Sequence, residues 1–144
     1  MRIINRERRT LVGSNVQVAD TWMGRARGYL GRPAPAQGDG ILLIPCTAIH
    51  TFGMTFDLDV LFLDDEGRVL EALRGFPPWR RTKRVAGARY VLEVPSGTIE
   101  ATATEVGDVL SWHLPRQVPV PGTPASLREG RRASNQGKGE RKSA

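Results

Sequence analysis

The 144-residue chain contains one cysteine and two histidines, so the side chains most used for disulfides, metal binding and nucleophilic catalysis are scarce. A single cysteine cannot form an intramolecular disulfide, and the fold must be held by burial and backbone pairing. The first residues also lack a long apolar run, so we expect neither a signal peptide nor a membrane span there. These absences together predict a cytoplasmic protein in a reducing compartment.

Acidic residues are scarce in the last part of the chain but not elsewhere. Residues 116–144 contain seven basic and two acidic side chains, whereas residues 1–115 contain fourteen basic and thirteen acidic ones. A nucleic-acid-binding domain normally carries its own basic face, so we expect no specific nucleic-acid partner for the nearly neutral part. Large apolar residues are almost absent after Val120, and such a segment cannot offset its ordering entropy by burial. We predict one globular domain at residues 1–115 and a disordered basic tail at residues 116–144.

Strand patterns outnumber helix patterns in residues 1–115. Apolar alternation and short apolar runs predict strands at residues 10–19, 41–44, 58–63, 68–73, 89–94 and 108–114. Either Asp20 or Thr21 can cap one short helix over residues 21–30, which ends at Gly31. The turn at residues 64–67 joins two of the strands into a hairpin. Six or seven short strands with one helix predict an α+β, mainly β fold, a mixed sheet that curls or closes into a small barrel.

The clearest candidate site is the segment that contains Cys46, His50 and Met54, spaced four residues apart. In an extended chain these three side chains would point to the same face. Thiolate, imidazole and thioether together favour copper, so one interpretation is a soft-metal site. A second makes Cys46 a nucleophile with His50 as its base. We favour a third, in which they pack in the core and no cofactor is needed, because free cysteines are usually buried.

Candidate ligand-binding residues also lie outside this cluster. Arg25 and Glu93 can form a buried ion pair or line a pocket for a polar ligand, and we favour the ion pair because a buried charge needs a partner. Trp79 follows two prolines and precedes two arginines, so it can contact a ligand or pack as part of a lid. Thr51 and Asp59 complete the set with His50, although Asp59 can equally accept backbone N–H groups near its strand.

Five short motifs occur in an order that resembles the DUF192 family, also called UPF0127, a bacterial and archaeal group without an assigned biochemical role. The motifs lie at residues 25–32, 40–44, 52–64, 90–97 and 107–109. The resemblance implies a compact, β-barrel-like domain. Two departures from the family pattern stand out. Residues 53–57 replace its commoner Trp-Met-Lys-Asn-Thr run, so no role of that Lys-Asn pair is carried over, and Tyr29-Leu30 replaces its usual Leu-Met.

The sequence therefore favours a small binding or accessory domain that is not an enzyme. Its ligand or protein partner is not indicated by any motif, and neither is its oligomeric state. The alternative is a soft-metal site or a cysteine-dependent enzyme centred on Cys46, His50 and Met54.

Overall fold

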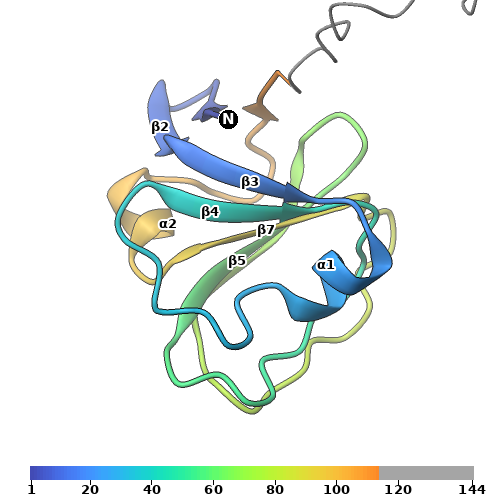
Figure 1. The fold of residues 1–144 in the computed structure, drawn as a ribbon. Coiled ribbons are helices and arrows are strands. Elements are labelled where there is room, and N and C mark those ends of the chain that lie inside the picture. The colour runs from blue at the N-terminus through green and yellow to red at the C-terminus, as the bar shows by residue number, and fades with distance from the viewer. Residues whose placement is uncertain (114–144) are drawn as a thin grey trace, which may run out of the picture. The chain divides into compact units, whose positions relative to one another are not determined.

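The computed structural model describes residues 1–113, which form eight strands and two short helices (Figure 1). The helices are α1 (Trp22–Arg27) and α2 (Thr98–Ala101). The strands are β1 (Ile3–Asn5), β2 (Thr10–Gly13), β3 (Asn15–Ala19), β4 (Asp39–Leu43), β5 (Leu58–Leu63), β6 (Val69–Phe76), β7 (Tyr90–Pro95) and β8 (Leu110–Ser111). The tail predicted at residues 116–144 lies outside the described residues.

The strands form two sheets, which confirms the prediction of a mainly β fold. The larger sheet has the order β3-β4-β7-β5-β6, and the smaller one has the order β2-β1-β8. Strands β3 and β4 are parallel and α1 lies in the connection between them, whereas the other neighbouring strands are antiparallel. Within residues 1–113 the first and last strands of each sheet do not pair with each other, so the closed barrel is not confirmed.

Both faces of the larger sheet are buried, which explains why every residue of β5 is buried. Leu61 and Leu92 contact one hydrophobic cluster together with residues of the smaller sheet. Val60 and Val91 contact a second cluster on the other face, where α1 ends. Successive side chains of a strand alternate between faces, and the central strand β7 therefore presents Glu93 to the second cluster, opposite Val60 in the register.

Element boundaries follow local chemistry where the sequence is explicit. The Thr21 hydroxyl accepts a hydrogen bond from the Gly24 N–H at 3.0 Å, which confirms one of the two predicted caps of α1. The hairpin of β5 and β6 is also confirmed. The prediction of a single strand at residues 10–19 is wrong. The strand is interrupted by a bend at Ser14, and its two halves belong to different sheets. Strand β1 and helix α2 were not predicted, since three and four residues are too few to show a period.

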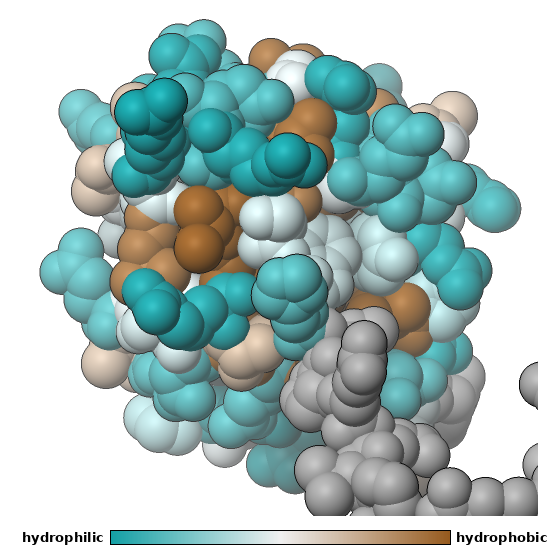
Figure 2. Space-filling model, turned by 90° about the horizontal axis from the view of Figure 1, so that it is seen from above, coloured by the Kyte–Doolittle hydropathy of each residue, from teal (hydrophilic) through white to brown (hydrophobic). Residues whose placement is uncertain are grey.

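The outer surface carries scattered hydrophobic residues among many charged ones. Ile4 and Leu11 pair across β1 and β2, and they are 41% and 42% exposed. Figure 2 views the molecule from the side of β2 and shows several separate hydrophobic areas among hydrophilic residues. Within residues 1–113 the structure contains no helix long and apolar enough to cross a membrane.

Candidate functional site

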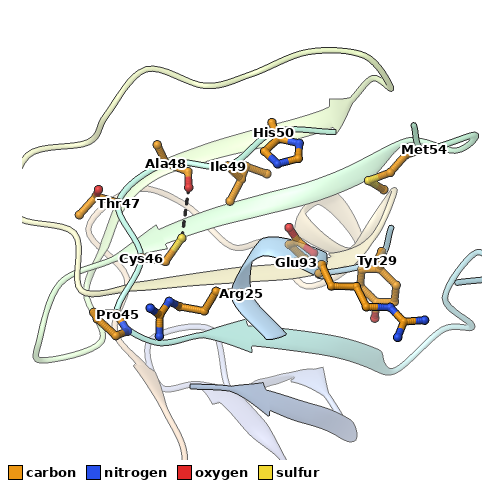
Figure 3. A pocket seen from close by; sticks show the side chains of 12 residues that line it. Arg25, Tyr29, Pro45, Cys46, Thr47, Ala48, Ile49, His50, Met54 and Glu93 are labelled. Carbon is orange, nitrogen blue, oxygen red and sulfur yellow. Dashed lines mark hydrogen bonds between the residues drawn. The ribbon is translucent and has the colours of Figure 1, made fainter. Parts of the chain in front are cut away.

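A pocket of about 390 Å³ lies at the end of α1, on the face of the larger sheet that carries the second hydrophobic cluster. Three segments line it: Arg25, Arg27, Gly28 and Tyr29 from α1 and its C-terminal turn, residues 45–50 with Met54 from the loop after β4, and Glu93 from β7. Figure 3 shows the loop side chains facing those of α1 and β7 across the pocket. The volume is at the lower end of the range for small-molecule sites.

Glu93 is the buried acidic group of this pocket. Its side chain is 4% exposed, and its Oε2 atom has no hydrogen-bond partner among the residues that the structure describes. Burial raises the pKa of Glu93 to about 7, although a backbone hydrogen bond from Tyr29 and the charge of Arg32 act to lower it. Near neutral pH the side chain therefore exists in both protonation states and can donate or accept a hydrogen bond.

Gly28 brings the backbone of the helix end directly against this carboxylate. It follows the last residue of α1 with a φ of 45°, and its N–H donates to the Gly24 carbonyl at 3.0 Å. A Cβ atom at this position would lie 2.9 Å from Glu93 Oε2, closer than such atoms normally approach. Only glycine meets both the positive φ and the lack of space.

Arg25 lines the pocket but does not form the ion pair that we predicted with Glu93. Its Nη1 donates to the carbonyl of Asp20 at 2.7 Å and to that of Ile44 at 3.2 Å. The ion pairs within residues 1–113 join Arg8 to Glu105 and Asp108 instead. The ion-pair prediction is wrong because the guanidinium donates to backbone carbonyls near the start of α1 and the end of β4 instead of to the Glu93 carboxylate. The structure places Arg25 and Glu93 in the other arrangement that the sequence allowed, as two lining residues of one pocket.

Cys46, His50 and Met54 all line the same pocket, although they reach it from a loop rather than from an extended strand. The favoured interpretation of core packing fits the buried Met54 and in part Cys46, but it is wrong for His50, which is exposed. The Cys46 thiol donates a hydrogen bond to the Ala48 carbonyl at 3.2 Å. Burial is the largest influence on the pKa of this thiol and raises it. The hydrogen bond with Ala48 is the next largest and lowers the pKa, the charge of Glu93 raises it, and the charge of Arg25 lowers it. The thiol is therefore protonated near neutral pH, the unreactive form of cysteine. Within residues 1–113 no three His, Cys, Asp or Glu side chains lie close enough to hold a metal ion.

Trp79 lies outside the pocket, at the end of a row of aromatic rings that begins at the pocket. His50 stacks on Phe52 with ring centroids 5.2 Å apart, and Phe52 lies 6.4 Å from Trp79. Trp79 is 64% exposed and has a φ of 60°, an unusual backbone conformation for a large side chain. The row gives the surface beside the pocket an aromatic character.

Thr51 and Asp59, also candidate ligand-binding residues, form hydrogen bonds within the fold instead. The Thr51 hydroxyl donates to the Pro77 carbonyl at 2.7 Å and accepts from the Arg80 N–H at 3.0 Å. Asp59 accepts hydrogen bonds from the backbone N–H groups of Gly75 and Ile99, both at 2.8 Å. Neither residue lines the pocket.

Sequence reasoning missed several lining residues, of which Gly28 and Tyr29 matter most. Tyr29 is buried, and burial raises the pKa of its phenol, with a further contribution from the charge of Glu93. Both residues belong to the motif at residues 25–32, and this motif was the available signal. This motif indicated that the end of the helix is important, but it did not indicate which strand the helix end would contact.

The chain matches proteins of one family over nearly all of its described part. The model of the DUF192 family (Uncharacterized ACR) matches residues 3–112. A UPF0127 protein of Pyrococcus horikoshii is 32% identical over 116 residues, which cover 76% of this chain and 97% of that protein. A UPF0127 protein of Pyrococcus abyssi is 34% identical over 116 residues, with 76% and 96% covered. The resemblance deduced from the five motifs is thereby confirmed.

Two solved structures have a similar fold. A protein of unknown function from Novosphingobium aromaticivorans superposes with a TM-score of 0.64 at 18% identity, covering 77% of this chain and 82% of that one. A candidate transcription regulator from Sinorhizobium meliloti superposes with a TM-score of 0.65 at 22% identity, covering 76% and 89%. At these identities the similarity concerns the fold alone.

Proposed function

The chain belongs to the DUF192 family, and we propose that in this member the pocket at the end of α1 binds a small polar ligand without transforming it. The observation that carries the proposal is the Glu93 carboxyl group, which is buried in the pocket wall with Oε2 unpartnered within residues 1–113. A buried polar atom without a partner destabilises a fold by about 1–3 kcal/mol. A ligand that donates a hydrogen bond to Oε2 would remove this penalty on binding.

The distribution of the family motifs supports the same site. Three of the five motif segments contribute lining residues: residues 25–32 provide the helix end, residues 52–64 provide Met54, and residues 90–97 provide Glu93. A fourth, residues 40–44, forms most of β4, which pairs with β7 beside Glu93. Half of the lining residues thus belong to motif segments, and the other half are residues 45–50, which lie outside the motifs.

The state of Cys46 argues against an enzyme. A nucleophilic cysteine needs a lowered pKa and a neighbouring base, whereas burial and the Glu93 charge both raise the pKa of Cys46. Its thiol also donates to Ala48 rather than to His50. We therefore expect the native protein to react slowly with iodoacetamide near neutral pH, and rapid labelling would favour the enzyme instead. We also propose a cytoplasmic location, with which a single free thiol is compatible.

The binding proposal is tested by titrating a library of small polar fragments into the full-length chain and recording proton–nitrogen correlation spectra. We expect at least one chemical class to shift the backbone signals of Gly28, Tyr29 and His50. These shifts should disappear in Glu93→Gln, which keeps the side-chain volume but removes the acidic group. Glu71→Gln, an exposed substitution on β6, is the matched control and should leave them unchanged. No response at the pocket from any fragment, or a response that survives Glu93→Gln, would contradict the proposal.

A further inference from the structure

The charged groups of the pocket are arranged by depth. Glu93, the acidic lining residue, is almost fully buried, whereas Arg25 is half-buried and Arg27 is exposed. A ligand that enters from solvent therefore passes positive charge before it reaches the carboxylate. Any complementary ligand must tolerate both signs of charge within one small volume.

Arg25 is held in place and still has donors to spare. Its Nη1 is fixed by the carbonyls of Asp20 and Ile44, which leaves the Nε and Nη2 groups of the planar guanidinium outside the ion pairs of residues 1–113. A fixed guanidinium is suited to bind a carboxylate through two parallel hydrogen bonds. Within the part of the chain that the structure describes, Arg25 forms no ion pair, so no acidic side chain already occupies its remaining donors.

The Cys46 thiol is influenced by the charges of both Glu93 and Arg25. Burial is the largest influence on its pKa, and of the charged groups Glu93 raises this pKa while Arg25 lowers it. Both charges therefore act on one side chain of the pocket. Figure 3 shows Cys46 on the same side of the pocket as Arg25, with Glu93 farther along the pocket beside Tyr29. A short molecule that lies over Cys46 can approach both the carboxylate and the guanidinium.

We propose that the ligand of this pocket is a small amino acid in the broad sense, with an ammonium group that binds Glu93 and a carboxylate that binds Arg25. The inference rests on the proposed function and deepens it. The ammonium donates to Glu93 Oε2, the atom without a partner in residues 1–113, and the carboxylate accepts from the free donors of Arg25. Ile49, Met54 and Tyr29 provide apolar walls for the short carbon chain between them.

Ligands with one charge fit the pocket less well. A simple amine would satisfy Glu93 but would be repelled by two arginines, and a simple carboxylate would be repelled by Glu93 whenever that group is ionised. A neutral amide would leave the guanidinium of Arg25 without an anion. The amine and carboxylate of one molecule match both ends of the site together, and the expected gain over either singly charged relative is about tenfold in affinity.

The test compares probes that differ only in charge and length. Glycine, β-alanine and γ-aminobutyrate vary the separation of the two groups, while butylamine, butyrate and butyramide each retain at most one charge. Each is titrated at neutral pH and low salt into the full-length protein, with the signals of Gly28, Tyr29 and His50 as the readout. At least one of the three amino acids should bind about tenfold more tightly than every single-charge probe.

Two variants assign the ends of the ligand. Glu93→Gln should weaken the best amino acid about tenfold while leaving butyrate no weaker, and Arg25→Gln should weaken the amino acid while leaving butylamine no weaker. Glu71→Gln is again the control. Butylamine, butyrate or butyramide binding as tightly as the amino acids would overturn the ligand class while leaving the pocket as a binding site. Absence of any pocket response to these probes and to the fragment library would overturn the binding function as well.

Discussion

Asp59 and Glu93 are two buried acidic residues on neighbouring strands, and they differ in how far their carboxylate oxygens are hydrogen-bonded. Asp59 pairs with Val94 and Glu93 pairs with Val60, so the two lie one register step apart on β5 and β7 and point to opposite faces of the sheet. Both Asp59 oxygens accept backbone N–H groups, from Gly75 and from Ile99. Glu93 Oε2 has no such partner within residues 1–113.

This difference in hydrogen bonding indicates that Asp59 has a structural role, whereas Glu93 is available to bind a ligand. Asp59 connects β6 to the first turn of α2, and its hydrogen bonds offset the free energy of burying it. Glu93 lacks this compensation, so its burial destabilises the unliganded fold, and a stability argument alone gives no reason for an acid there. Four substitutions can break or refine this contrast between the two acids.

The largest effect is expected for Asp59→Ala. The substitution leaves the N–H groups of Gly75 and Ile99 without an acceptor beneath the surface of the protein. Each unsatisfied buried group costs about 1–3 kcal/mol, so the free energy of unfolding should fall by roughly 4 kcal/mol. Urea denaturation followed by circular dichroism measures this. A loss below about 1 kcal/mol would show that Asp59 is not a structural carboxylate.

Glu93→Gln should have the next largest effect, and its sign depends on pH. The pKa of Glu93 is raised from an ordinary 4.5 to about 7 in the folded state, so the folded protein retains a proton that the unfolded chain releases between these values. Its contribution to stability is full below the lower value and is lost as the pH rises toward the higher one. Above this window, removing the ionised group should raise the free energy of unfolding by an amount on the order of 3 kcal/mol.

The measurement is a series of urea denaturation curves for wild type and Glu93→Gln across this pH window. The variant should lose the part of the pH dependence that Glu93 causes, and the difference between the two proteins should grow with pH. Parallel curves at all pH values would mean that the carboxyl group has no raised pKa in the folded state.

Gly28→Ala should cost about 1–2 kcal/mol, because a backbone with positive φ is strained for any residue with a Cβ. The new methyl group would also press on the Glu93 carboxylate, so binding of the best probe should be lost. Gly31→Ala provides a matched control, since Gly31 also has a positive φ but a Cβ atom there would have no neighbour within 4 Å among the described residues. Equal effects of the two substitutions on binding would show that contact with Glu93 is unimportant.

Met54→Leu should have the smallest effect. Met54 is 5% exposed and belongs to the second hydrophobic cluster, where a change that nearly conserves volume costs less than about 1.5 kcal/mol. Probe affinity should be unchanged because no role of the sulfur is involved. A large loss of affinity, measured by the same titration, would indicate that the thioether contacts the ligand chemically.

The sequence predicted the sheet better than it predicted the site, and the reason is the range of the interactions involved. The apolar run that became β5 and the cap of α1 at Thr21 depend on local pattern, and both were predicted. The different environments of Asp59 and Glu93 depend on Gly75, Ile99 and Gly28, which are distant in sequence. Both acids lie in apolar strands, so no local pattern distinguishes them.

The cluster of Cys46, His50 and Met54 also shows how local sequence patterns miss residues that are distant in the chain. The spacing of Cys46, His50 and Met54 suggested one shared face in an extended chain, and the three do share a pocket. They reach it through a loop, however, and the acid that completes the pocket comes from β7. The sequence could therefore indicate which segment mattered, while the group at the centre of the site was paired with the wrong partner.

The most direct test is the pKa of Glu93, because a raised value shows that the buried carboxyl group lacks partners that stabilise its ionised form. Carbon-detected NMR of the side chain in the full-length protein measures this pKa. We predict a titration midpoint near 7, caused by burial without a partner for Oε2 within residues 1–113. The midpoint should fall when the best amino-acid probe is bound, because a nearby ammonium favours the ionised form. A midpoint near the ordinary value of 4.5 in the free protein would contradict the binding role of Glu93, since it would mean that the carboxylate is already solvated or paired.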